Sequence, residues 1–338
     1  MTTDTASAPT HPKGGSAPSG LRRLFSGSAA RSLGLVLALL LICIAGAATA
    51  GDRFVDVGNL LTVLRQAAVL GVIAVGMTFV ITAGGIDLSI GSVLGLTSVV
   101  GSLTAVQALA ADSSWLVMVF LALAVGVGAG LVNGVVIAYG NVVAFMATLA
   151  MLIGARGLAE LIGERRTFVV SEPGFREFFS GDVFGVPMIV VIFAVVAAAG
   201  WFLLNRTTFG RRTVAIGGNR EAARLAGVHV KRHLVYLYAL AGLTAGIAGL
   251  MMMGRTQSGT STHGMLYELD AIAAVVVGGT LLIGGRGTIM GTVLGVLIFT
   301  TLTNVFTLNN LSTSVQAVVK GVIIVVAVLL QQRFARRS

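Results

Sequence analysis

The sequence predicts an all-α fold: a polytopic helical membrane protein with about ten transmembrane helices and glycine-rich breaks. The 338 residues are 56% hydrophobic and only 11% charged, and the mean hydropathy is +0.94. Apolar runs recur at about 20 residues, the length that crosses a hydrocarbon core about 30 Å thick. Because these runs do not alternate apolar and polar residues as barrel strands do, helices must satisfy the backbone hydrogen bonds in lipid.

The apolar runs divide the chain into a membrane domain and two polar tails. Residues 1–30 are rich in Ser, Thr, Ala, Gly and Pro and are expected to form a disordered cytoplasmic tail. Residues 31–331 form the membrane domain, and 332–338 form a basic cytoplasmic tail. The spans are expected near 33–50, 59–83, 88–110, 115–139, 142–163, 186–204, 233–254, 267–284, 288–307 and 313–331.

The first span carries an ambiguity about processing. It ends in AATAGD, which resembles the small-residue cleavage site of a signal peptide. We expect an uncleaved helix, because the run is long and a long tail precedes it; the alternative is a cleaved leader. In both cases the chain emerges outside near Asp52.

The placement of charge predicts the topology. A net charge of +10 is common in nucleic-acid-binding proteins, but here the basic residues lie in short segments beside apolar runs, so we expect no nucleic-acid partner. With both termini in the cytoplasm, the segment 205–232, with seven Lys or Arg, is a cytoplasmic loop. The segment 164–185 carries three Arg and four acidic residues and therefore fits the outside.

The string GGNREAARLAGV, residues 217–228, predicts a short helix inside that cytoplasmic loop. Two glycines permit a turn, Asn219 caps the helix, and alanines occupy one side opposite the arginines. Such a helix offers a soluble partner a surface on which to push; the alternative is an ordinary loop that only determines topology. The residues assigned to this coupling role are Gly217, Gly218, Asn219, Glu221, Ala222, Ala223, Arg224, Leu225, Ala226 and Gly227.

Two segments of the chain echo one another. VGMTFVITAGGIDLSIGSVLGL (75–96) and VGGTLLIGGRGTIMGTVLGV (277–296) share VG-x-T, GG and G-x-VLG with a gap of two residues. Both lie at junctions between successive spans and place glycine where helices break or pack closely. Transporters with internal repeats place their pathways at such interrupted helices. The alternative is a chance match within a glycine-rich membrane chain.

The first of these segments contains an acidic residue, Asp87. An acid at membrane depth is costly, so it must face water, a partner or a helix end. Asp87 either lines a solute path with its neighbours or caps the next span, where the helix dipole favours an anion; the two roles can coexist. The residues assigned to the path are Thr82, Gly84, Gly85, Asp87, Ser89, Asn133, Phe145 and Asn304. The two asparagines have the alternative role of interhelical hydrogen-bond partners.

Other polar residues within the spans have structural interpretations. Arg156 and Glu160 are four residues apart and are predicted to form a salt bridge. Lys320 either pairs with an acid, contacts substrate or extends its ammonium toward the interface. Arg65 and Gln66 lie near the outer end of the second span and reach toward the interface.

Enzymatic chemistry is not indicated by any motif. No histidine has metal-ligand spacing with cysteines or acids, so no metal site is predicted. GGRGTIMG (284–291) lacks the Gly-Lys-Ser/Thr that holds ATP phosphates, and no Ser-His-Asp arrangement has a supporting nucleophile turn. We therefore predict no catalytic residue and no cofactor, and energy must come from a partner or an ion gradient.

GGNREAARLAGV resembles the cytoplasmic coupling loop of ABC importer permeases, in the branch that takes up ribose and related monosaccharides. GMTFVITAGGIDLSIGS (76–92), YELDAIAAVVVGGT (267–280) and QAVVKGVIIVVAV (316–328) are similar to that branch's segments in the same order, and the resemblance covers about residues 59–331. NVVAFMATLA (141–150) departs from the pattern because it lacks the proline before Phe145. The loop 164–185 identifies no particular sugar.

The resemblance implies a non-catalytic permease in the lipid bilayer of the bacterial inner membrane. Its implied partners are a cytoplasmic ATP-binding subunit, an external sugar-binding protein and a second permease copy, expected to be identical. The alternatives are a permease for branched-chain amino acids, an ion-coupled secondary transporter and a scaffold without transport. YELDAIAAVV favours the sugar branch, and ion coupling requires acids within the membrane, of which Asp87 is the one strong candidate.

Overall fold

The computed structural model describes residues 28–335, with side chains described for 33–323 and 325. The predicted tails 1–30 and 332–338 fall mostly outside this range; residues 28–30 begin the first helix and 332–335 end the last. The helices are α2 (Ser28–Ala50), α3 (Asp52–Val55), α4 (Val57–Thr82), α5 (Ile90–Ser102), α6 (Thr104–Asp112), α7 (Leu116–Ala138), α8 (Ala144–Gly163), α9 (Pro173–Ser180), α10 (Met188–Arg206), α11 (Thr208–Gly218), α12 (Arg220–Leu225), α13 (Val230–Thr256), α14 (Tyr267–Val277), α15 (Ile289–Leu308) and α16 (Thr313–Ala335).

Strands occur only as two short pairs within the described residues. β1 (Phe168–Val169) pairs antiparallel with β4 (Ser258–Gly259), and β2 (Asp182–Val183) pairs antiparallel with β3 (Val186–Pro187). The fold is therefore all-α, as the sequence predicts.

The predicted count of ten continuous spans is not confirmed. Among residues 33–323, seven helices are long and apolar enough to cross a membrane, or eight if α5 and α6, which meet at 53°, form one span; α16 falls only partly within this range. The predicted span 267–284 is not a continuous helix, because α14 has 11 residues and ends at Val277. Gly279, Gly284 and Gly285 follow it with positive φ, a conformation that glycine adopts without steric cost.

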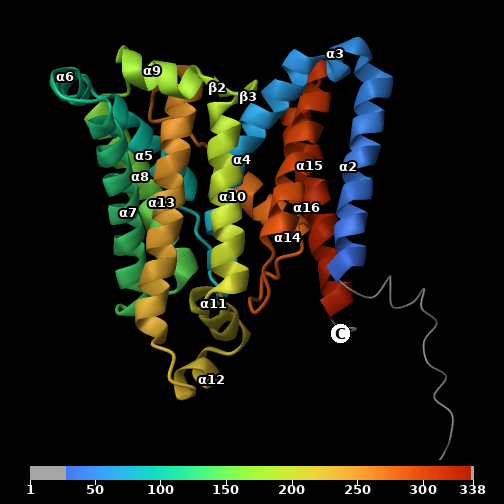
Figure 1. Ribbon diagram of the computed structural model, residues 1–338. Helices are drawn as coiled ribbons and strands as arrows, with labels where there is room; N and C mark the ends of the chain where they lie inside the picture. The colour runs from blue at the N-terminus through green and yellow to red at the C-terminus, as the bar shows by residue number, and fades with distance from the viewer. Residues whose placement is uncertain (1–27, 336–338) are drawn as a thin grey trace, which may run out of the picture.

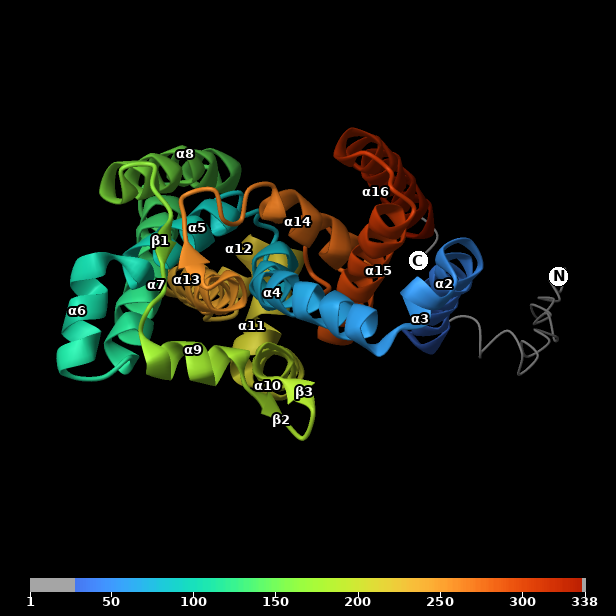
Figure 2. The ribbon, with the colours of Figure 1, turned by 90° about the horizontal axis from the view of Figure 1, so that it is seen from above.

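The bundle has two distinct ends (Figure 1). We call them the α9 end, which carries α3, α6 and α9, and the α12 end, which carries α11 and α12. α4 lies near the middle when the molecule is viewed along this axis (Figure 2). It packs against α10, α13, α14 and α15, and all of its residues from Ala67 to Thr82 are buried.

α13 is the second central helix, and it contacts α7 very closely. The chain brings Gly126 and Gly130 of α7 against Gly242 of α13, and a Cβ at Gly126 or Gly242 would collide with the facing backbone. Small residues let apolar helices approach in lipid, where van der Waals packing replaces the hydrophobic drive. In contrast, α2, α7, α8 and α10 leave many large apolar side chains exposed, as expected of lipid-facing helices.

Candidate functional site

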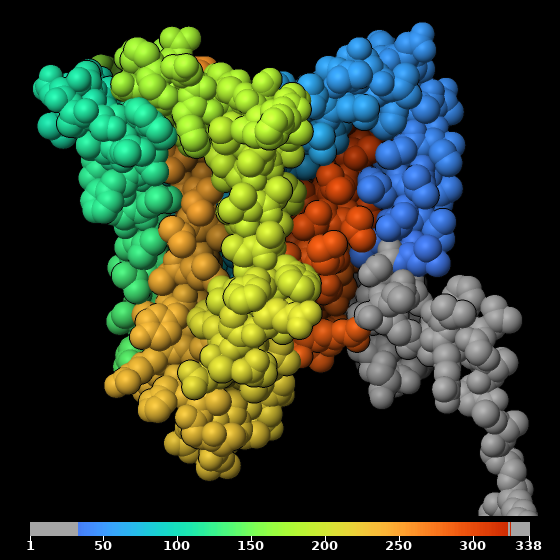
Figure 3. All heavy atoms as spheres, in the orientation of Figure 1, coloured from blue at the N-terminus to red at the C-terminus, as the bar shows by residue number. Residues whose placement is uncertain are grey.

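The predicted coupling helix is present at the α12 end. It begins at Arg220, and Asn219 caps it, since its side-chain oxygen accepts a hydrogen bond from the Ala222 N–H at 2.9 Å. Glu221 and Arg224 form an exposed ion pair at 2.6 Å. The hydrogen bonds that Arg224 donates to the Glu221 carboxylate lower the pKa of Glu221. Gly227, with a φ of +84°, lies two residues beyond the end of the helix. Residues 208–228 form a lobe that projects from the bundle (Figure 3).

One alanine attaches this helix to the bundle. Ala223 is 5% exposed and belongs to an apolar cluster with Phe79 of α4, Ile216 of α11 and Leu234 of α13. The neighbouring α11 is joined to α13 by a hydrogen bond of 2.8 Å between Thr213 Oγ1 and His233 Nε2. The predicted alanine face is therefore an intramolecular contact at Ala223, and the charged side chains stay exposed.

The two echoing segments and the coupling loop meet at one place, which we call the glycine junction (Thr82, Gly84, Gly217, Gly284 and Gly285). The Gly285 N–H donates a hydrogen bond to the Thr82 carbonyl oxygen at 2.9 Å. A Cβ at Gly284 would lie 2.9 Å from Gly84 N and 3.0 Å from Gly217 Cα. A Cβ at Gly217 would collide with Thr82 O. Backbone from three separate segments is thus in direct contact.

The echo and the contacts correspond in space. Gly84 and Gly284, which the echo aligns, are adjacent, and both have positive φ, at +78° and +87°. Deeper in the bundle, the hydroxyls of Thr78 and Thr292, which the echo does not align with each other, lie 2.8 Å apart and join the two segments; both side chains are fully buried. Each segment occupies the turn between a helix that arrives at the α12 end and one that leaves it (Figure 1).

Three of the residues assigned to the path form a buried chain of hydrogen bonds. Asp87 Oδ1 accepts from the Ser89 N–H at 2.9 Å and from the Ser89 hydroxyl at 2.6 Å. Asn133 Nδ2 of α7 donates to Ser89 Oγ at 2.9 Å. The carboxylate binds the backbone N–H of Ser89, two residues further along the chain and immediately before α5, whereas α5 itself has no side-chain cap hydrogen bond; the capping role considered for Asp87 is therefore not seen. Asn133 acts as an interhelical partner.

A cavity of about 550 Å³ opens at the α12 end beside the glycine junction. Gly84, Gly85 and Phe145, all assigned to the path, line it together with Arg220 and Tyr238. The Tyr238 hydroxyl is buried and has no hydrogen-bond partner among the described residues. Nothing in the sequence marks Tyr238 as a candidate, because a single tyrosine in an apolar run cannot be told from a core residue.

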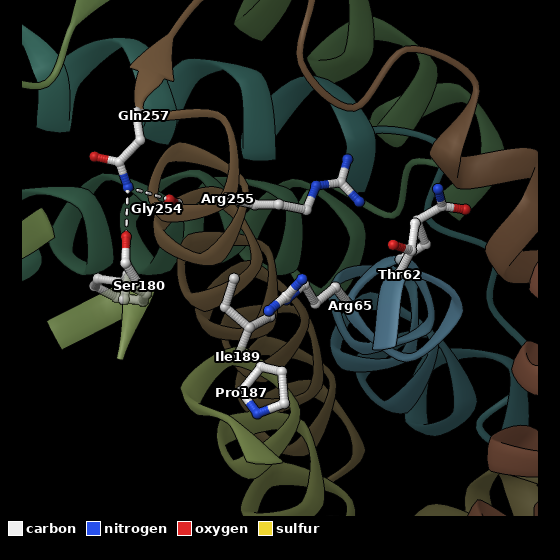
Figure 4. A pocket seen from close by; sticks show the side chains of 10 residues that line it. Thr62, Arg65, Ser180, Pro187, Ile189, Gly254, Arg255 and Gln257 are labelled. Atoms are coloured by element: carbon white, nitrogen blue, oxygen red, sulfur yellow. Dashed lines mark hydrogen bonds between the residues drawn. The ribbon is translucent and has the colours of Figure 1, made fainter. Parts of the chain in front are cut away.

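A second cavity, of about 470 Å³, lies at the α9 end between α4, α9, α10 and α13. Arg65 and Arg255 extend into it from α4 and α13 (Figure 4). The sequence points to Arg65 and Gln66. It gives no signal for Arg255 and Gln257, which lie at the C-terminal end of α13 and belong to no motif.

A third cavity, of about 250 Å³, shares Gln66 and Arg255 with the second. Its wall includes Lys320, whose ammonium lies 3.1 Å from Asp270 Oδ2. The acid partner of Lys320, one of the alternatives considered from sequence, is therefore Asp270 of α14.

One predicted ion pair differs from the structure. The predicted salt bridge between Arg156 and Glu160 is wrong: Arg156 donates to the carbonyl oxygens of Ser261 and His263, and Glu160 pairs with Arg165 at 2.9 Å. The loop after β4 passes beside α8, and its backbone carbonyl groups accept the hydrogen bonds that Arg156 would otherwise direct at Glu160.

Asn304 stands apart from the other residues assigned to the path. It exchanges hydrogen bonds of 2.7 and 3.1 Å with Asn59, which joins α15 to the start of α4 rather than to the glycine junction. This is the interhelical pairing given as its alternative role.

Within residues 28–335, no three His, Cys, Asp or Glu side chains lie close enough to hold a metal ion.

Apolar helices, two glycine-rich breaks and polar cavities at both ends define a polytopic membrane protein of the transport class. The chain belongs to the family described as the branched-chain amino acid transport system permease component, whose model matches residues 59–328. No solved structure gives a significant match.

Individual relatives carry sugar names. The ribose import permease protein RbsC of Escherichia coli (strain K12) is 41% identical over 301 residues, covering 88% of this chain and 92% of that protein. The same protein of Bacillus subtilis (strain 168) is 41% identical over 303 residues, covering 89% and 91%. The galactose/methyl galactoside import permease protein MglC of Salmonella typhimurium is 36% identical over 325 residues, covering 90% and 96%. These names favour sugar over branched-chain amino acids.

Proposed function

We propose that this chain is the membrane permease of an ATP-driven importer and forms the translocation path for a monosaccharide similar to ribose. The family match and the sugar permeases among its relatives support this function. The partners are a cytoplasmic ATP-binding subunit, an external sugar-binding protein and a second permease copy, identical to the first. The chain lies in the bacterial inner membrane with the α12 end and both termini in the cytoplasm.

The glycine junction is the observation that carries the proposal. Because Gly217 contacts the backbone of both Thr82 and Gly285, a displacement of α11 and α12 must move the segments 83–89 and 278–288 as well. An ATPase that pushes on the exposed Glu221 and Arg224 therefore acts on both broken segments at once. Closely packed backbone transmits such a displacement because packed interiors have low compressibility.

The cavity at the α12 end gives the sugar an exit on the cytoplasmic side. Gly84 and Gly85 form part of its wall, so movement of the glycine junction changes its shape directly. Phe145 offers an aromatic face to a sugar ring, and the free Tyr238 hydroxyl offers a hydrogen bond. The permease itself is not an enzyme in this scheme, and ATP hydrolysis takes place in the partner subunit.

The test is sugar-stimulated ATPase activity and uptake in vesicles that contain this chain, the ATPase subunit and the binding protein. We expect the intact complex to hydrolyse ATP and to accumulate sugar. Glu221→Arg reverses one charge of the exposed pair and should abolish ATPase association and stimulation. The matched control is Glu177→Arg, an exposed acid of α9 at the opposite end, which should leave association with the ATPase subunit unchanged. Uptake that needs no ATPase and follows a proton or sodium gradient contradicts the proposal.

A further inference from the structure

The cavity at the α9 end has the properties of a ligand site. It encloses about 470 Å³, within the range of small-molecule pockets. Its polar side chains are Thr62, Arg65 and Gln66 from α4, Ser180 from α9, Arg255 from α13, and Gln257 directly after α13. None of these residues belongs to the glycine junction or to the coupling loop.

Arg255 carries a hydrogen-bond donor without an acceptor. Its Nη1 is buried and has no partner among the described residues, and its Nη2 reaches only the sulfur of Met252, at 3.2 Å. A buried donor on a charged group costs free energy when it has no acceptor. One explanation for such a donor is a ligand that accepts its hydrogen bond. Arg65 faces the same cavity from α4 (Figure 4).

The neighbouring amide shows what remains available for a ligand. Gln257 is already occupied, because its Nε2 donates to Ser180 Oγ at 3.1 Å and to Gly254 O at 2.6 Å, and its Oε1 accepts from Arg176. These bonds hold the rim of the cavity in place. The Arg255 guanidinium therefore remains the group whose donor, Nη1, lacks an acceptor among the described residues.

Arg255 and Gln66 line both this cavity and the one of about 250 Å³. Beyond them, the second wall carries Thr300, Thr303 and the ion pair between Lys320 and Asp270. A solute that passes from one of these cavities to the other therefore meets Arg255 and Gln66.

We propose that Arg255 and Gln66 form a sugar-binding gate at the outer end of the path. The guanidinium and the amide donate hydrogen bonds to hydroxyl and ring oxygens of a neutral monosaccharide, and the threonines accept from its hydroxyls. A sugar presents several acceptors around one ring, so it satisfies the fork of Arg255 without a counter-charge. The inference rests on the proposed function for the direction of transport and for the class of solute.

The experiment measures binding of D-ribose, the probe, to the purified full chain in lipid nanodiscs by saturation-transfer NMR. We expect binding to the natural chain and a loss of about ten- to hundredfold in affinity for Arg255→Gln, the ratio for one hydrogen bond from a charged group. Arg53→Gln is the control, since Arg53 is exposed on α3 at the same end and does not line the cavity. Equal ribose affinity in Arg255→Gln and the natural chain overturns the gate.

Two further arms identify other ligands for this cavity. If D-ribonate binds and D-ribose does not, the two arginines form an anion site and the proposal is wrong. It is also wrong if Arg255→Gln weakens only the complex with the binding protein and leaves ribose binding intact.

A cysteine probe gives the answer if Arg255→Gln does not fold. Thr62→Cys in a Cys43→Ala chain places one thiol in the cavity wall, since Cys43 is the only cysteine in the sequence. D-ribose should slow its alkylation several-fold, whereas Arg53→Cys in the same background should react at an unchanged rate. Alkylation of Thr62→Cys that ribose does not slow refutes the gate. ATP-driven uptake with no such protection leaves the proposed function standing.

Discussion

At the α12 end, the effect of adding a side chain to a glycine depends on which atoms lie next to its Cα. Gly217 and Gly218 are adjacent in α11, and the sequence offers no reason to distinguish them. A Cβ at Gly217 collides with the backbone of Thr82 and Gly285, whereas a Cβ at Gly218 meets nothing within 4 Å. The first glycine is thus required by packing, and the second is not.

The first residue-scale prediction compares Gly217→Ala with Gly218→Ala. Both changes raise helix propensity by about 0.5–1 kcal/mol, so that effect cancels. Overpacking at Gly217 costs about 1–3 kcal/mol and forces the glycine junction apart. We expect ATP-driven uptake to fall about tenfold in Gly217→Ala, with basal ATPase activity retained, and to stay unchanged in Gly218→Ala. Equal uptake in the two variants means that the junction does not transmit motion.

The second residue-scale prediction concerns the buried chain from Asp87 to Asn133. Ser89→Ala removes one hydrogen bond to the carboxylate and leaves the Asn133 amide unpaired. The cost is about 1–3 kcal/mol for a buried polar group left without a partner. The apparent melting midpoint in detergent should fall by several degrees, whereas Ser113→Ala, an exposed serine of the α6–α7 turn, should leave it unchanged. An unchanged midpoint for Ser89→Ala shows that water replaces the lost bond.

At the scale of elements, the helix α14 explains why a span predicted from hydropathy is not a helix throughout. The apolar C-terminal part of this 11-residue helix continues into the glycine-rich segment 278–288, so the hydropathy of the run stays high while the backbone leaves the helix. The exposed backbone groups are satisfied partly by α4, through the bond from Gly285 N to Thr82 O, and partly within the segment, through the bond from Leu281 N to Arg286 O. Non-helical backbone at membrane depth is tolerated only where protein or water satisfies it.

The element-scale prediction concerns the ion pair that joins α14 to α16. Lys320→Met leaves the carboxylate of Asp270 without its ammonium partner. The Asp270 side chain is 27% exposed, so the carboxylate is only partly buried. Breaking a fully buried pair costs about 3–5 kcal/mol, and the remaining exposure reduces this to about 2 kcal/mol. The double variant Lys320→Met with Asp270→Leu should recover most of the loss in the melting midpoint. A double variant as unstable as the single one shows that the pair contributes more than charge compensation.

At the scale of the whole molecule, the two ends differ in chemistry and in proposed partner. The α12 end presents the lobe of residues 208–228 with its arginines, and the α9 end presents α9 and the cavity with Arg65 and Arg255. Basic segments mark the cytoplasmic side of membrane proteins, which favours the proposed cytoplasmic position of the lobe. In the proposed orientation, the α9 end faces the external binding protein.

Labelling with a membrane-impermeant maleimide tests this orientation in a Cys43→Ala chain. Arg232→Cys, just after the lobe, should react only when the cytoplasmic face is open to the reagent, and Asp182→Cys in β2 should react in intact cells. Both positions are exposed in the chain. The opposite pattern inverts the topology and removes the ATPase from the α12 end.

The sequence by itself determined the class of protein and the existence of the short helix α12. Hydropathy sets the number of apolar runs, and Asn219 with its following alanines specifies a capped helix through contacts between near neighbours in the chain. The echo of 75–96 in 277–296 also identified the two breaks, because glycine pairs are local signals.

Only the tertiary structure decided which of these features meet. The contact of Gly217 with Thr82 and Gly285, the partner of Lys320 and the shared position of Arg255 between two cavities all join residues far apart in the chain. The prediction for Arg156 failed for the same reason, since carbonyls from residues 261 and 263 compete with the acid one turn away. Local spacing measures distance along a helix, and it carries no information on what another segment brings to the same side chain.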